Sequence, residues 1–143
     1  MKLLELFDSR DKKKRLSHIR NLVGLACADG KLEKSELDLI FHIGIKGGLT
    51  PDELNRIVER PDSILFAPPD SYRERIEQLY DMVLVTMVNG EIHDNEIIVC
   101  KLIAERLGFK HQIIDKMIHD VIESIAKGIA ADIAISQLLR SLS

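Results

Sequence analysis

Apolar residues recur every three or four positions along most of the chain, which is the spacing of one buried face of an α-helix. No alternation of apolar and polar residues with a period of two persists, so the sequence predicts no strand. The positions expected on buried helix faces include Leu16, Ile19, Leu22, Val23, Ala26, Cys27, Leu37, Ile40, Phe41, Ile45, Leu54, Ile57, Val58, Tyr72, Ile76, Leu79, Tyr80, Val83, Met87, Ile114, Met117, Ile118, Val121, Ile122, Ile125, Ile133, Ile135, Leu138, Leu139 and Leu142. The pattern therefore predicts an all-α fold.

Turn and capping residues divide this pattern into about seven helices. Thr50, Pro51 and Glu53 form a capping box with proline at the first helical position. The prolines at 61, 68 and 69 mark a linker over residues 61–70. The predicted helices run from Asp8 or Ser9 to the turn at 29–30, up to 47–48, over 51–60, from Asp70 or Ser71 to 89–90, over about 94–107, about 111–127 and about 129–142.

The chain repeats itself with an offset of 60 residues and no gap. The segment 28–32 aligns with 88–92, and 48–49 aligns with 108–109. Few residues are identical, but the matching ones form turns, caps, helix ends and core positions. We predict two helix–turn–helix repeats, at about 15–60 and 71–125, with an additional C-terminal helix at about 129–142.

Composition favours helices packed on helices. Of the 143 residues, 45% are hydrophobic and 30% charged, which is typical of a globular protein, and only 4% are aromatic, with no Trp. The core must therefore be aliphatic. We expect one domain over residues 1–143, with both repeats closed around one aliphatic core.

Each repeat contains the pattern Asp/Asn-Gly-x-apolar-x-x-x-Glu, at residues 29–36 and 89–96. The spacing from Gly to Glu matches the second half of an EF-hand loop. The first two ligand positions of an EF-hand would fall on Leu25 and Cys27, and on Val85 and Met87, none of which supplies an oxygen. The sequence thus argues against EF-hands.

Two interpretations of these turns remain open. In the structural one, the glycine makes the turn, Leu32 and Ile92 enter the core, and the final Glu caps the next helix. In the functional one, the two turns lie close together and form an oxygen-rich site for Ca²⁺, Mg²⁺ or Mn²⁺. The ligands would be Asp29, Glu33, Glu36, Asn89, Asp94 and Glu96.

With these paired turns about sixty residues apart between amphipathic helices, the chain resembles the TerB-like family, named after the tellurite resistance protein TerB. The resemblance covers roughly residues 15–125, with Asp29 and Glu36 matching the first turn and Gly90 and Glu96 the second. Asn89 departs from the usual Asp, which removes one charge. The resemblance implies an all-helical, cytoplasmic, non-enzymatic protein of the stress response. It also implies metal binding at the acidic turns and a protein partner in a membrane-associated complex.

Other candidate sites are weaker. His111, Asp115, His119 and Glu123 share a helix face that suits either a metal or solvent. The basic cluster at residues 10–15 suits phosphates, an anionic membrane surface or a solvated helix face. Asp8 and Asp11 are interleaved with it.

Cys27 and Cys100 lie in apolar helical contexts, so we expect both to be free and buried. There is no catalytic or phosphate-loop motif, and the net charge of −3 does not favour nucleic-acid binding.

The start of the chain does not resemble a signal peptide, and no apolar stretch approaches the roughly 20 residues that span a bilayer. We expect a cytoplasmic protein without membrane insertion. The sequence does not predict whether the protein is a monomer or an oligomer. The favoured hypothesis is a non-catalytic interaction or sensing module that binds a divalent cation. The alternatives are a metal-free helical interaction module and, third, a carboxylate-based hydrolase.

Overall fold

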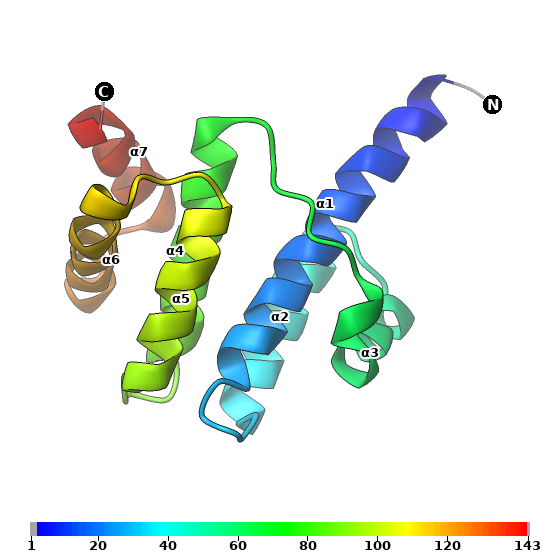
Figure 1. Ribbon diagram of the computed structural model, residues 1–143, viewed down its shortest axis with the longest axis horizontal. Helices are drawn as coiled ribbons and strands as arrows, with labels where there is room; N and C mark the ends of the chain where they lie inside the picture. Colours follow the sequence, from blue (N-terminus) through cyan, green and yellow to red (C-terminus); the bar gives the residue numbers. More distant parts are fainter. Residues whose placement is uncertain (1–2, 143) are drawn as a thin grey trace. The chain divides into compact units, whose positions relative to one another are not determined.

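The computed structural model describes the backbone of residues 3–142 and the side chains of residues 10–142. The described part is all-helical, as predicted, with seven α-helices, one short 3₁₀ helix and no strand (Figure 1). The elements are α1 (Leu3–Ala26), α2 (Lys34–Lys46), α3 (Pro51–Glu59), η1 (Pro61–Ser63), α4 (Tyr72–Met87), α5 (Asp94–Arg106), α6 (His111–Ala126) and α7 (Ala131–Leu142).

The chain forms two compact units, Met1–Pro68 and Pro69–Ser143, called unit 1 and unit 2 below. The boundary falls in the predicted proline-rich linker. Each unit contains one of the two repeats. The expectation of a single core shared by both repeats stays a prediction.

In unit 1, α2, α3 and η1 pack against α1 (Figure 1). The predicted capping box begins α3: Thr50 Oγ1 accepts the Glu53 N–H at 3.2 Å, and Glu53 Oε1 accepts the Thr50 N–H at 2.9 Å. Leu54 and Ile57 of α3 are completely buried, as predicted. Buried apolar residues of the three helices therefore meet in an aliphatic core.

In unit 2, α4 is the central helix and contacts α5, α6 and α7. Ser71 caps it by accepting the Glu74 N–H at 3.0 Å. The buried residues of α4 lie on more than one side of the helix because it is covered by three others; they are Ile76, Leu79, Tyr80, Met82, Val83, Val85 and Thr86. The aliphatic core predicted from composition is confirmed here as well.

Some predictions were wrong. Helix α1 begins at Leu3 rather than at Asp8 or Ser9, because helix-forming residues precede them and no breaker intervenes. Cys27 is exposed, since it follows the last residue of α1, whereas Cys100 is buried as expected. Ile92 is 44% exposed and does not enter the core.

Three further residues were wrongly placed on buried faces. Ile45, in the last turn of α2, is 47% exposed. Tyr72, the first residue of α4, is 42% exposed and packs its ring edge-on against Phe109, with 5.5 Å between the ring centroids. Ile133 is 51% exposed because α7 buries only the side that contacts α4 and α6.

Candidate cation-binding turns

The two acidic turns have the same backbone. The first turn (residues 29–36) joins α1 to α2, and the second turn (residues 89–96) joins α4 to α5. Gly30 has φ of 86° and Gly90 has φ of 83°, a left-handed conformation that favours glycine. Both N–H groups close the turn, Gly30 to the Cys27 carbonyl at 2.9 Å and Gly90 to the Met87 carbonyl at 3.0 Å. The repeat seen in the sequence is thus a repeat in structure.

The residue before each glycine makes the same hydrogen bond. Asp29 Oδ1 accepts the Lys31 N–H at 3.2 Å, and Asn89 Oδ1 accepts the Glu91 N–H at 3.2 Å. An amide oxygen performs this role as well as a carboxylate oxygen does. The change from Asp to Asn therefore keeps the turn and removes its charge.

The last residue of each turn is a buried carboxylate. Glu36 is 1% exposed and Glu96 is fully buried, and they are the only acidic side chains classed as buried among residues 10–142. Burying a charged carboxylate costs several kcal/mol unless hydrogen bonds or a counter-charge compensate. The repeat thus places the same energetically costly group at the start of α2 and of α5.

The Glu36 carboxylate is only partly compensated. Its Oε1 accepts the Glu33 N–H at 3.2 Å, the helix-capping bond that the structural interpretation predicts. Its Oε2 is buried, and no donor in the described part of the chain lies within hydrogen-bonding distance of it. An oxygen of this kind suits a cation, which would supply the missing positive partner.

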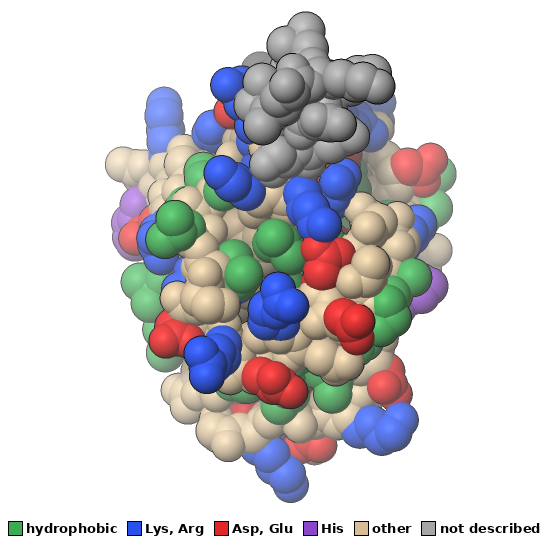
Figure 2. Space-filling model, turned by 90° about the vertical axis from the view of Figure 1, so that its right-hand side faces the viewer, with side chains coloured by type: hydrophobic (Ala, Val, Ile, Leu, Met, Phe, Trp, Pro, Cys, Tyr) green, Lys and Arg blue, Asp and Glu red, His purple; other side chains and the backbone are tan. Residues whose placement is uncertain are grey.

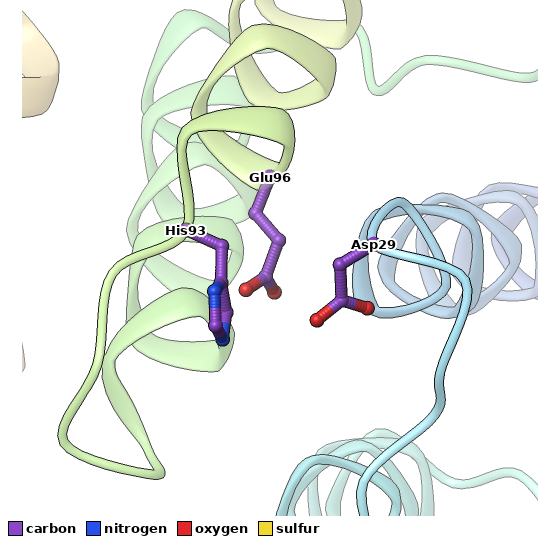
Figure 3. A group of neighbouring side chains, drawn as sticks. All are labelled: Asp29, His93 and Glu96. Atoms are coloured by element: carbon purple, nitrogen blue, oxygen red, sulfur yellow. The ribbon is translucent and has the colours of Figure 1, made fainter.

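In the second turn, a histidine accompanies the buried carboxylate. Figure 3 shows His93 and Glu96 projecting side by side from the start of α5, and it also draws Asp29, which follows α1 in unit 1. A His93 ring nitrogen lies within 4.8 Å of a Glu96 carboxylate oxygen. Glu91 Oε2 lies 3.9 Å from His93 Nε2. The second turn therefore offers one nitrogen donor beside its oxygens.

Sequence reasoning missed His93, although the repeat could have found it. His93 aligns with Glu33 at the 60-residue offset, and both residues occupy the N-cap position of the helix that follows. The predicted ligand Asp94 is instead the first residue of α5 and is exposed. The sequence analysis considered only oxygen ligands, whereas the structure places the His93 imidazole beside the Glu96 carboxylate.

Burial and the carboxylates of the first turn raise the pKa of the neighbouring Cys27 thiol. Its partial burial, then the Glu36 carboxylate and then that of Asp29 raise the pKa of Cys27 above its ordinary value. Two carboxylates of the predicted site thus act on one neighbouring group within unit 1. In contrast, burial alone raises the pKa of Cys100 to about 12.

Neither unit by itself forms a closed ligand cage. Within each unit, no three His, Cys, Asp or Glu side chains of the described residues offer ligand atoms within 4.8 Å of one another. Asp29, Glu33 and Glu36 therefore do not converge as a complete set of protein ligands. An ion at the first turn would keep several water molecules, as Mg²⁺ commonly does.

The candidate metal face of α6 is divided into separate pairs. Lys101 Nζ lies 2.8 Å from Asp115 Oδ1, His111 Nδ1 lies 2.6 Å from Glu105 Oε1, and His119 Nε2 lies 3.4 Å from Glu123 Oε1. The Lys101 ammonium lowers the pKa of Asp115 by hydrogen bonding and by charge. These pairs agree with the solvated-face interpretation.

Comparison with protein-family models, curated proteins and solved structures finds no match to this chain. The resemblance to the TerB-like family stays a prediction. Among the described residues, no helix is both long and apolar enough to cross a membrane.

Proposed function

We propose that this chain is a non-catalytic binding module that responds to a divalent cation at its glycine turns. The observation that supports the proposal most directly is the buried Glu36 carboxylate, whose Oε2 has no donor among the described residues. Glu96 repeats the buried position in unit 2. A bound cation would compensate the burial of charge, so ion binding and the stability of the turn would be coupled.

The two turns suit different ions. The first turn offers carboxylate oxygens with few protein ligands, which suits hydrated Mg²⁺ or Mn²⁺ better than Ca²⁺, since Ca²⁺ takes six to eight oxygens. The second turn adds the imidazole of His93, a donor that suits Zn²⁺ and similar transition metals. The proposal therefore predicts selectivity at each turn, which a non-specific charge effect would not produce.

Thermal unfolding tests the proposal. We expect Mg²⁺ or Mn²⁺ to raise the Tm of metal-stripped protein, because binding to the folded state alone adds about 2.7 kcal/mol at a hundredfold excess over Kd. Glu36→Gln should remove this increase. In metal-free buffer the same variant should be as stable as the parent or more so, because it no longer buries an incompletely paired charge.

The controls separate the turns from general acidity. Glu96→Gln should preferentially reduce the response to Zn²⁺, and Glu59→Gln, an exposed residue at the end of α3, should change neither response. A Tm that no ion changes would refute the cation proposal, as would equal losses in all three variants.

A failure of that test would favour the metal-free interaction module. Ile98 and Leu102 support this second candidate, because they are one helical turn apart on α5 and are 55% and 56% exposed. The aligned positions of α2 hold exposed Asp38 and His42. An apolar pair where the other repeat is polar is typical of a surface that contacts another protein.

A further inference from the structure

The outward side of α5 carries an apolar pair that the other helices of unit 2 do not cover. Ile98 and Leu102, one helical turn apart, are 55% and 56% exposed. The buried residues of α5, which are Glu96, Cys100 and Ala104, lie on the opposite side of the helix by register. On the face drawn in Figure 2, by contrast, hydrophobic side chains are scattered among charged ones. An exposed apolar pair on one helix face is more typical of a contact surface than single exposed residues are.

Two carboxylates line one edge of this side of α5. At about 100° per residue, the exposed residues of the helix span an arc of about 120°, with the apolar pair at its centre. Asp94 and Glu105 fall on the side of Ile98, and no carboxylate of α5 falls on the side of Leu102. The apolar pair with Asp94 and Glu105 is called the α5 face below.

Both carboxylates of the α5 face are accessible to a cationic group from outside. Asp94 is the first residue of α5 and is exposed. Glu105 Oε1 lies 2.6 Å from His111 Nδ1, but this pair is at the surface, and the Glu105 side chain is 43% exposed. The lysine nearest this edge by register, Lys101, lies 2.8 Å from Asp115 and is paired with it. The edge therefore keeps a negative charge.

Unit 2 as a whole is also acidic, and unit 1 has no equivalent of the α5 face. Residues 69–143 include 12 acidic and 8 basic side chains, whereas residues 1–68 include 11 acidic and 12 basic ones. The positions of α2 that align with the apolar pair hold Asp38 and His42, and Asp38 is paired with Lys34 at 2.8 Å. An apolar pair beside an acidic edge is thus specific to the second repeat.

We propose that the α5 face binds a basic amphipathic helix of another protein. The apolar side of that helix would pack on Ile98 and Leu102, as in other contacts of amphipathic helices. Its Lys or Arg residues would lie beside Asp94 and Glu105, so the two surfaces have complementary charge. A second copy of the α5 face would repeat the acidic edge instead of complementing it. The inference rests on the proposal that the chain is a binding module, and it does not depend on cation binding at the turns.

Titration of the full chain with synthetic peptides in metal-free buffer tests the proposal. The first peptide is an amphipathic helix of Leu and Lys, with Leu at every third or fourth position, and fluorescence anisotropy measures its Kd. We expect micromolar binding that weakens as the salt concentration rises. A peptide of the same composition in scrambled order, and one with Glu in place of Lys, should bind at least about tenfold more weakly.

Two double variants of the chain separate the apolar from the acidic contribution. Ile98→Ser with Leu102→Ser should weaken binding of the Leu/Lys peptide more than about tenfold, because the exposed halves of the pair together amount to about one aliphatic side chain. Asp94→Asn with Glu105→Gln should weaken it about three- to tenfold and reduce its salt dependence. All four positions are exposed, so both variants should remain folded, which circular dichroism checks.

The matched controls change the same kinds of residue elsewhere on the surface. They are Ile45→Ser with Ile133→Ser, and Glu77→Gln with Asp132→Asn. Both controls should bind the Leu/Lys peptide within about twofold of the parent protein, since surface substitutions away from a contact have small effects.

Several outcomes would overturn the proposal. These are no binding of the Leu/Lys peptide, equal binding of the Glu peptide, or equal losses in the controls and in the variants of the α5 face. A dimer in sedimentation equilibrium that the apolar double variant dissociates would also overturn it, because a second copy would then occupy the face. The Tm response to cations is a separate measurement, so a failure here is distinguishable from a failure of the cation proposal.

Discussion

The first and second turns have the same backbone conformation but carry different side chains beside their buried Glu. Both contain a glycine with positive φ, a side-chain oxygen that accepts the N–H two residues later, and a buried Glu in the first turn of the next helix. Their helix-capping residues differ, with Glu33 in the first turn and His93 in the second. Where the backbone imposes a requirement, the repeats agree, and where it does not, they have diverged.

This difference separates structural from functional roles. The turn requires an oxygen before the glycine, and either Asp29 or Asn89 meets that need. It does not require a negative charge at that position, and only the first turn has one there. The positions that differ between the turns, Asp29 against Asn89 and Glu33 against His93, are therefore the ones that would set the ligand preference of each turn.

The largest expected effect tests the shared backbone. Gly30→Ala and Gly90→Ala should each lower the free energy of unfolding by about 1–2 kcal/mol, because a side chain disfavours the left-handed conformation. Denaturant unfolding of both variants measures this. Nothing lies within 4 Å of a Cβ at either position, so the cost would come from the backbone alone.

Gly24→Ala is the matched control for that prediction. Gly24 lies inside α1, and its added Cβ would also meet nothing within 4 Å. Alanine should stabilise this helical position by about 0.5–1 kcal/mol, the opposite sign. If all three substitutions had the same sign, the turns would not depend on their glycines.

A smaller effect sharpens the electrostatic contrast between the turns. Alkylation of native protein should modify Cys27 slowly near pH 8, because its raised pKa keeps the thiol protonated, and should leave Cys100 unmodified. Glu36→Gln removes one cause of the raised pKa, so the rate profile should move to lower pH with a several-fold faster reaction. The rate of iodoacetamide labelling against pH measures this shift.

The second turn provides the control for the thiol experiment. Glu96→Gln changes the aligned carboxylate in unit 2, and the causes of the raised pKa of Cys27 lie in its own unit. Its labelling profile should match that of the parent protein. An identical acceleration by both variants would mean that the reaction reports a general loosening of the fold.

The smallest effect compares one ion pair in each unit. Hydrogen bonding to Lys12 is the main cause that lowers the pKa of Glu53, and Lys101 acts likewise on Asp115. A lowered carboxyl pKa adds stability that is present above the ordinary values of 4.5 and 3.8 and is lost as pH falls through the lowered pKa. Lys12→Met should cost less than about 1 kcal/mol at neutral pH and nothing once Glu53 is protonated.

Thermal melts from pH 7 to pH 2 measure this dependence. Lys101→Met should also lower the stability at neutral pH, but by less than Lys12→Met does, since Asp115 is largely exposed. If Lys12→Met lowered the stability equally at every pH in this range, the aliphatic part of the Lys12 side chain, rather than its charge, would stabilise unit 1.

The helical architecture was predictable because its signals are local. Thr50 with Glu53 and Ser71 with Glu74 act over three residues, and the structure shows the expected capping bonds. Periodicity likewise predicted the burial of Ile57 and Leu79. Such features depend on the chain within one or two helical turns, so the sequence contains them in full.

Exposure and proximity depend on the neighbouring helices, and sequence patterns did not determine them. Ile133 fits an apolar stripe but is exposed, because α7 has neighbours on one side only. Asp94 resembles a ligand in sequence, whereas the structure places His93 next to the Glu96 carboxylate. Only tertiary packing buried Glu36 and Glu96, because burial of a charge depends on what covers it rather than on its spacing along the chain.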